Sequence, residues 1–226
     1  MGEIVFSEYF EDRFVVHAKA SDILREMEHI LRLSKLNKRP KNLLITADAG
    51  CGKTAVADTF IKSARANLDD TNSPTTAQIV GMQMPAMPTE SDIMLELLSK
   101  MGVDFVGKKS QAHLLSVLRN ISGAAGLKLI VIDEFHNLMA TSKMKILSSL
   151  NFLKWIGNEL KVPIIALGTN SCQLLLPYDN QFSERYKQAF LPVWSDGDDF
   201  RNFIFCQRRS KISPRGGVKV YQCSYA

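Results

Sequence analysis

The sequence contains few cysteines, and their spacing matches no known disulfide or metal framework. The 226 residues include Cys51, Cys172, Cys206 and Cys223, with no C-x-x-C pair among them. A small disulfide-held fold or a zinc module needs closer and more numerous cysteines. The histidines are equally scattered. We therefore expect no zinc site and a reducing cytoplasm.

Long hydrophobic runs are also missing. No stretch of about 18 consecutive apolar residues occurs, so the sequence predicts no transmembrane helix and no membrane partner. The first residues, MGEIVFSEYFEDRF, are acidic and lack the apolar centre of a secretion signal. A cytoplasmic protein is the expectation from both features.

Acidic residues are absent from the end of the chain. Residues 201–226 hold six of the 28 lysines and arginines and no aspartate or glutamate, so the net charge of +5 belongs to this segment. Residues 206–226 have neither helical nor strand periodicity. Two interpretations stand: a basic arm that binds nucleic acid, or a non-native reading frame after about Phe205, which we favour. Neither leaves room for a helical lid.

Hydrophobic residues make up 46% of the chain and fall into short apolar runs between amphipathic stretches. The length suits one α/β domain. Strands are expected at 43–45, 78–84, 127–132 and 162–168. Helices are expected at 21–35 with Ser21 as N-cap, after 54, at 89–102, at 110–121 with Gly123 as its stop, and at 142–160. This order predicts a parallel sheet with helices on both faces, divided into a lead-in (1–40), a core (41–205) and the tail (206–226).

A glycine-rich loop follows the first predicted strand, and a helical pattern begins at Ala55. This arrangement is typical of a phosphate-binding loop, because its N–H groups face phosphate oxygens and the helix start adds partial positive charge. Lys53 is expected to reach the β- and γ-phosphates, and Thr54 to ligate Mg²⁺. The candidates for nucleotide contact are Ala47, Asp48, Ala49, Gly50, Cys51, Gly52, Lys53 and Thr54.

Ala47 stands where the strict loop pattern has glycine. A side chain is tolerable there if the backbone keeps a negative φ. The alternative interpretation of this stretch is a glycine-rich turn that binds nothing.

Two carboxylates end the apolar run 127–132, in a strand that we expect beside the loop strand. Acids at the carboxyl end of a buried parallel strand face the ligand crevice. Asp133 is placed to hold the Mg²⁺ shell, and Glu134 to orient and polarise the attacking water. The alternative is a solvated acidic turn. His136 either senses the γ-phosphate or packs at the strand end.

Polar residues after the last predicted strand extend this site. Thr169, with Asn170 as second choice, could hydrogen-bond the γ-phosphate or the water, although both residues also cap helices well. Arg185 follows at a distance suited to an arginine finger, which stabilises charge on the transferring phosphoryl group and often comes from a neighbouring subunit. A surface arginine paired with Glu184 is the alternative.

These residues together resemble the AAA+ ATPases, and more narrowly the TniB/TnsC-type ATP-binding proteins of bacterial transposons. The resemblance covers about residues 13–205. It rests on RPKNLLI (39–45), GCGKT (50–54), the prolines at 85 and 88, IDEFHNL (132–138) and LGT (167–169). The loop and the acids are generic to many ATPases, whereas the IDEFHNL string and the proline-broken segment are more specific.

The resemblance implies an ATPase that binds ATP and Mg²⁺ between subunits of a homo-oligomeric ring or helical filament. Such proteins assemble on double-stranded DNA in the bacterial cytoplasm and recruit or stimulate a transposase together with target-selection proteins. By position, Arg185 would act in trans. DNA phosphates, read without sequence preference, would contact Lys100, Lys108 and Lys109. Those lysines could also be ordinary solvated residues.

Ala47 and the absence of a recognisable lid after Phe205 depart from the family pattern. Two other functions therefore stay open. One is a nucleotide switch in signalling that hydrolyses slowly and gates a partner domain. The other is an ATP-dependent scaffold that does not hydrolyse, or a truncated inactive remnant.

Overall fold

The computed structural model describes residues 15–16, 18–34, 42–67, 78–107, 109–193, 197, 200–201 and 221–222. The predicted tail therefore lies outside the described residues except for Tyr221–Gln222, which pair as β7 with β1 (Val15–Val16). The prediction that a helical lid is missing after residue 205 also concerns residues outside the described ranges. The division of the chain at residues 40 and 205 stays a prediction. No helix in the described ranges is long and apolar enough to cross a membrane.

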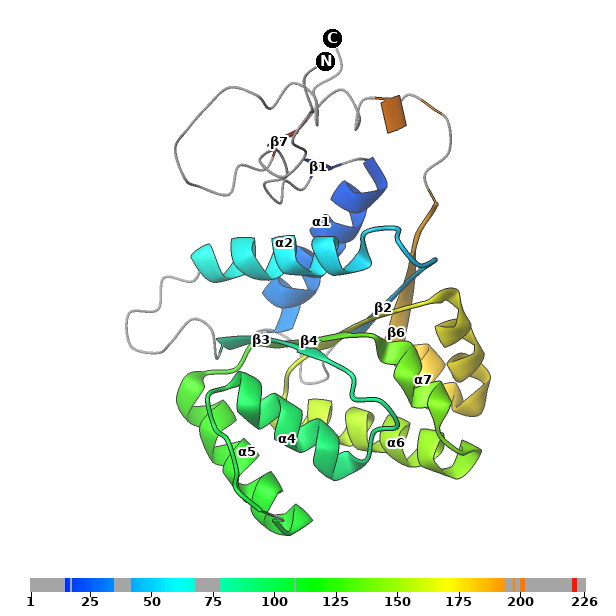
Figure 1. Ribbon diagram of the computed structural model, residues 1–226. Coiled ribbons are helices and arrows are strands. Elements are labelled where there is room, and N and C mark those ends of the chain that lie inside the picture. Colours follow the sequence, from blue (N-terminus) through cyan, green and yellow to red (C-terminus); the bar gives the residue numbers. More distant parts are fainter. Residues whose placement is uncertain are drawn as a thin grey trace, which may run out of the picture.

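A parallel sheet of five strands occupies the centre of the molecule (Figure 1). The strand order is β3-β4-β5-β2-β6, and every neighbouring pair is parallel. All residues of β2, β4 and β5 are buried, as expected where helices cover both faces of a sheet. The strands are β2 (Asn42–Ala47), β3 (Ile79–Gln83), β4 (Leu129–Asp133), β5 (Ile164–Gly168) and β6 (Tyr186–Leu191).

Helices lie on both faces of this sheet, which confirms the predicted α/β architecture. On one face are α1 (Ala18–Ser34) and α2 (Lys53–Ala66); on the other are α4 (Glu90–Lys100), α5 (Gln111–Ala125) and α6 (Lys143–Leu160) (Figure 1). Successive strand residues point to opposite faces, so Leu43 and Ile45 join the core under α1 and α2, while Leu44 joins the core under α4–α6. The described residues also form three short helical segments, η2 (Phe135–Ala140) before α6, and η3 (Asn170–Tyr178) and α7 (Asn180–Arg185) after β5.

The helix ends confirm some sequence signals and correct others. Thr89 and Asp92 form the predicted capping box of α4. Ser21 is not an N-cap, because α1 begins at Ala18 and includes it. The expected stop at Gly123 is also wrong: α5 continues to Ala125, and Gly126 ends it with a left-handed φ of 63°. A glycine inside a helix costs only about 1 kcal/mol relative to alanine, so the end falls where a left-handed residue is needed.

The sheet differs from the sequence-based prediction in two ways: it contains the additional strand β6, and β4 is not the neighbour of β2. β6 is an edge strand whose central residues are largely exposed, so its sequence, YKQAFL, lacks the apolar run of a central strand. The acidic strand β4 is not beside the loop strand β2, because β5 lies between them. Residues that follow β5 are therefore placed between the phosphate loop and the acids.

Candidate nucleotide-binding site

The glycine-rich loop joins β2 to α2 at the carboxyl edge of the sheet. Gly50 and Gly52 have φ values of 77° and 82°, a left-handed backbone that side chains disfavour. A Cβ built on either glycine would meet no atom within 4 Å, so open space borders the loop. Ala47 is the buried last residue of β2 and is paired with Leu191. It is not among the described residues with positive φ, which accounts for an alanine at this position.

Lys53 and Thr54 are the first two residues of α2. The Lys53 ammonium is buried and donates hydrogen bonds to the backbone carbonyls of Ala47 (3.1 Å) and Asp48 (2.8 Å). No side chain caps the start of α2, so its first N–H groups and the positive end of its dipole face the loop. An anion placed in the loop would meet these groups and the lysine.

The acids at the end of β4 meet the loop across 79 residues of sequence. The Thr54 hydroxyl donates to Asp133 Oδ2 at 2.6 Å. Asp133 Oδ1 accepts the backbone N–H of Glu134 at 2.7 Å. A hydroxyl and a carboxylate are both hard oxygen ligands, and Mg²⁺ sites use few protein ligands of this kind. The pair fits the predicted Mg²⁺ ligands.

Glu134 has a left-handed backbone, with a φ of 54°. Its side chain is 40% exposed, and Oε2 lies 3.3 Å from Nε2 of His136. The carboxylate is therefore open to solvent. The histidine contacts the carboxylate, a placement that neither sequence-based interpretation of His136 included.

The two polar residues after β5 have different partners. The Thr169 hydroxyl is 2.6 Å from that of Ser171 and does not cap η3 with its side chain. The Asn170 amide donates to Asp48 Oδ1 in the phosphate loop at 2.6 Å. Asn170, our second choice, is therefore the one that contacts the loop. This contact spans 122 residues, and no local sequence signal pointed to it.

Close packing at the end of β5 holds the site together. A Cβ on Gly168 would lie 2.3 Å from Cys172 Sγ and 3.2 Å from the backbone nitrogen of His136. Burial raises the pKa of the Cys172 thiol to about 12, with opposing effects from Lys53 and Glu134. The thiol is therefore a neutral packing group at ordinary pH.

Arg185 lies at the amino ends of the strands, whereas the phosphate loop lies at their carboxyl ends. The next residue, Tyr186, pairs with Asn42, the first residue of β2, whereas the phosphate loop follows Ala47. With a rise of about 3.3 Å per residue, one strand length of about 17 Å separates Arg185 from its own loop. Its guanidinium donates to Asn158 Oδ1 on α6 at 3.1 Å. The structure does not bring Arg185 to the other candidate residues of the same chain.

Of the candidate DNA-binding lysines, Lys100 is the last residue of α4, and Lys109 lies between α4 and α5. Lys100 is 3.4 Å from Glu96 Oε1 on the same helix. Lys109 is exposed, and Lys108 lies outside the described residues. None of these contacts involves the phosphate loop.

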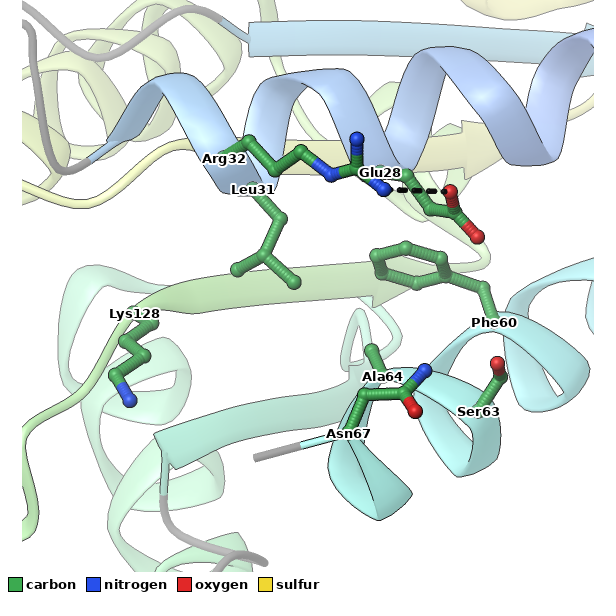
Figure 2. A pocket seen from close by; sticks show the side chains of 8 residues that line it. All are labelled: Glu28, Leu31, Arg32, Phe60, Ser63, Ala64, Asn67 and Lys128. Carbon is green, nitrogen blue, oxygen red and sulfur yellow. Dashed lines mark ion pairs between the residues drawn. The ribbon is translucent and has the colours of Figure 1, made fainter. Parts of the chain in front are cut away.

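A separate pocket of about 330 Å³ lies between α1 and α2 (Figure 2). Leu31, Phe60 and Ala64 line it, and the Arg32–Glu28 ion pair lies along one side at 3.7 Å. Lys128, which precedes β4, places this pocket at the amino edge of the sheet. None of the candidate site residues predicted from the sequence lines this pocket.

Five parallel strands between helical layers, with a lysine- and threonine-bearing glycine loop facing an acidic strand end, form the fold of the AAA+ P-loop NTPases. The sequence narrows this class, since the model of the family described as bacterial TniB protein matches residues 6–196. The chain belongs to the TniB family.

Solved structures with a similar fold include proteins from Aeropyrum pernix and Pyrobaculum aerophilum. The Aeropyrum pernix ORC2 protein in ADPNP–ADP complexes has a TM-score of 0.65 and 14% identity, over 89% of this chain and 54% of that one. The ORC1 protein of the same organism in complex with DNA has a TM-score of 0.64 and 16% identity, over 90% of this chain and 52% of that one. Cdc6p from Pyrobaculum aerophilum has a TM-score of 0.62 and 12% identity, over 89% of this chain and 53% of that one.

The chain therefore spans about half the length of these proteins. A search of the curated proteins finds no match.

Proposed function

We propose that this protein is an ATP-binding and ATP-hydrolysing regulator of DNA transposition, which assembles on duplex DNA and recruits or activates a transposase. The observation that carries the proposal is the 2.6 Å contact between Thr54 and Asp133. It joins the two predicted metal ligands from distant parts of the chain, beside a lysine and an uncapped helix start. The role in transposition rests on the family.

Each residue of the site has a role in this proposal. Lys53 would exchange its two carbonyl partners for phosphate oxygens, and the N–H groups of residues 48–54 would surround them. Thr54 and Asp133 would hold Mg²⁺, which when bound neutralises charge on the phosphates. Glu134 would orient water and accept its proton. Asn170 would keep the carboxylate of Asp48 at the end of β5. Thr169 would lie next to Asn170 with its hydroxyl at that of Ser171.

The position of Arg185 supports an assembly of several copies. An arginine about 17 Å from its own phosphate loop cannot reach the phosphates bound there, but a neighbouring copy could present the same residue to them. A head-to-tail contact of this kind generates rings or helical filaments. In such an assembly, Lys100, Lys108 and Lys109 would contribute to contact with DNA phosphates. A solved neighbour of this fold is itself in complex with DNA.

Sedimentation and ATP turnover, each measured with and without duplex DNA, test the proposal. Large assemblies that require both ATP and DNA, together with DNA-stimulated turnover, are the expected result. If DNA changes neither the ATP turnover nor the size of the assemblies, the result would instead point to a signalling switch. Nucleotide binding without turnover would point to a scaffold. Either result would reject the function proposed here.

A further inference from the structure

His136 and Glu134 flank an aromatic anchor. Phe135, between them, is fully buried and stacks on Phe182 with ring centroids 6.2 Å apart. The side chains on either side of this anchor turn towards each other, so that His136 Nε2 lies 3.3 Å from Glu134 Oε2. The His136 side chain is 30% exposed and the Glu134 side chain 40%. The contact is therefore at the rim of the site, where water can reach the carboxylate.

The turn that carries this pair is fixed from three directions. The Asn137 backbone N–H donates to the Glu134 carbonyl at 2.9 Å, and its side-chain amide donates to the Met84 carbonyl at 2.8 Å. The backbone nitrogen of His136 packs against the end of β5, where only a glycine fits at position 168. The backbone that carries the imidazole and the carboxylate is therefore held on both sides of His136.

The burial of the imidazole decides which nitrogen carries the proton. Nδ1 of His136 is buried and has no hydrogen-bond partner among the described residues. A proton on Nδ1 would leave a buried donor unsatisfied and would turn the lone pair of Nε2 towards a carboxylate. A proton on Nε2 avoids both costs. In this tautomer the N–H is on the nitrogen that lies 3.3 Å from Glu134 Oε2.

We propose that His136 is a positioning residue for Glu134: it holds Oε2 and leaves Oε1 free to receive the proton of the attacking water. A catalytic base oriented by a third group is a recurrent arrangement in enzymes. This inference rests on the proposed function, because it assigns Glu134 the role of base. It gives His136 a role distinct from sensing the γ-phosphate, since the histidine acts through the carboxylate.

Steady-state kinetics on three variants test the role. His136→Leu removes the donor, His136→Gln keeps an N–H donor, and His113→Leu is a control on α5, where the ring contacts Phe105 instead. We expect His136→Leu to lower kcat roughly tenfold, with the affinity for a non-hydrolysable ATP analogue within about twofold of wild type. His136→Gln should recover most of the loss, and the control should match wild type. An unchanged or raised kcat in His136→Leu, or no recovery in His136→Gln, overturns the proposal.

A second readout does not depend on turnover. In ¹⁵N-histidine NMR of the nucleotide-free protein, the His136 signals are those that disappear in His136→Leu. We expect the proton on Nε2, and a shift of these signals in Glu134→Gln. Signals that show the proton on Nδ1, or that ignore the glutamate substitution, overturn the proposal. A wild-type protein without ATPase activity would reject the proposed function, while this measurement would still decide whether the two side chains interact.

Discussion

At the scale of single residues, the site consists of groups that each have a protein partner. Lys53 bonds two loop carbonyls, Thr54 bonds Asp133, and Asn170 bonds Asp48. Each of these groups could release its partner for a ligand of the same chemistry: phosphate oxygens for the lysine, a cation for the hydroxyl–carboxylate pair. The arrangement is therefore preorganised, and single substitutions should separate binding from hydrolysis.

Substitution of Lys53 by alanine should abolish nucleotide binding. The change removes the ammonium group that bonds the loop carbonyls, which in P-loop proteins contacts the phosphates. Titration with a fluorescent ATP analogue measures the effect, and Lys62→Ala on the exposed side of the same helix is the matched control. Unchanged affinity in Lys53→Ala would remove this residue from the site.

Substitution of Glu134 by glutamine should leave binding intact and stall hydrolysis. An amide cannot accept the proton of water, whereas Thr54 and Asp133 still hold the metal. General-base catalysis is worth about 10²–10⁴-fold, so kcat should fall at least about a hundredfold at unchanged affinity for the analogue. Glu28→Gln on α1 controls for loss of a carboxylate. Normal turnover in Glu134→Gln would assign the base to another group.

A methyl group added at Gly168 should damage the site from behind. Its Cβ would lie 2.3 Å from Cys172 Sγ and 3.2 Å from the His136 nitrogen, and overpacking of this kind costs about 1–3 kcal/mol. Chemical denaturation measures the loss. Gly168→Ala/Cys172→Ala should recover part of it, since the sulfur is gone.

Gly123→Ala is the matched control for this substitution. No atom lies within 4 Å of the new Cβ, and the residue is inside α5, so this variant should be slightly more stable than wild type. Equal stability of Gly168→Ala and wild type would contradict the crowding at the end of β5.

At the scale of elements, features that lie within one segment of the sequence were predicted, whereas features that depend on contacts between distant segments were not. The phosphate loop, β4 and the capping box of α4 each lie within one short segment, so periodicity and motif spacing were sufficient. β6 has the pattern of an exposed edge, and it forms a strand because it pairs with β2. The Asn170–Asp48 contact likewise depends on β5 lying beside β2. Neither feature has a signal inside its own segment.

The short helix α7, which carries Arg185, begins at a capping residue that also forms an ion pair. Asp179 caps α7 by accepting the N–H groups of Gln181 and Phe182, and it pairs with Lys154 of α6. Burial by itself raises the pKa of Asp179, but the hydrogen bond and charge of Lys154 and the two N–H groups outweigh it and lower the pKa below its usual range. The ionised form therefore stabilises the fold above the unfolded pKa of about 3.9, and this contribution is lost as the pH falls through the lower folded value.

Asp179→Asn should therefore destabilise the protein in a pH-dependent way. At pH 7 we expect a loss of about 1–3 kcal/mol, measured by urea denaturation, although asparagine still caps the helix. The difference from wild type should shrink as the pH falls below about 4. Lys154→Met/Asp179→Asn should be more stable than Lys154→Met alone, which leaves a carboxylate without its cation. A difference that is constant between pH 7 and pH 3 would contradict this account.

At the scale of the whole molecule, the two ends of the sheet carry two halves of one proposed reaction centre. The phosphate loop and the acids lie at the carboxyl edge, and Arg185 lies one strand length away beside the first residue of β2. Each copy would therefore offer a nucleotide site on one edge and an arginine on the other, which is the geometry of a head-to-tail contact. A single chain would be a poor ATPase, and activity would depend on protein concentration.

Mixing two inactive variants tests this division directly. Arg185→Ala keeps the phosphate loop and Glu134, whereas Glu134→Gln keeps the arginine and the ability to bind nucleotide. Each alone should turn over at least about a hundredfold more slowly than wild type. In an equimolar mixture, random neighbours place an intact arginine beside an intact site at about a quarter of the contacts, so turnover should rise towards a quarter of the wild-type rate. Arg32→Ala mixed with Glu134→Gln is the control and should simply dilute the active copies. Failure of the mixture to regain activity, or full activity of Arg185→Ala alone, would show that this arginine does not act across the subunit contact.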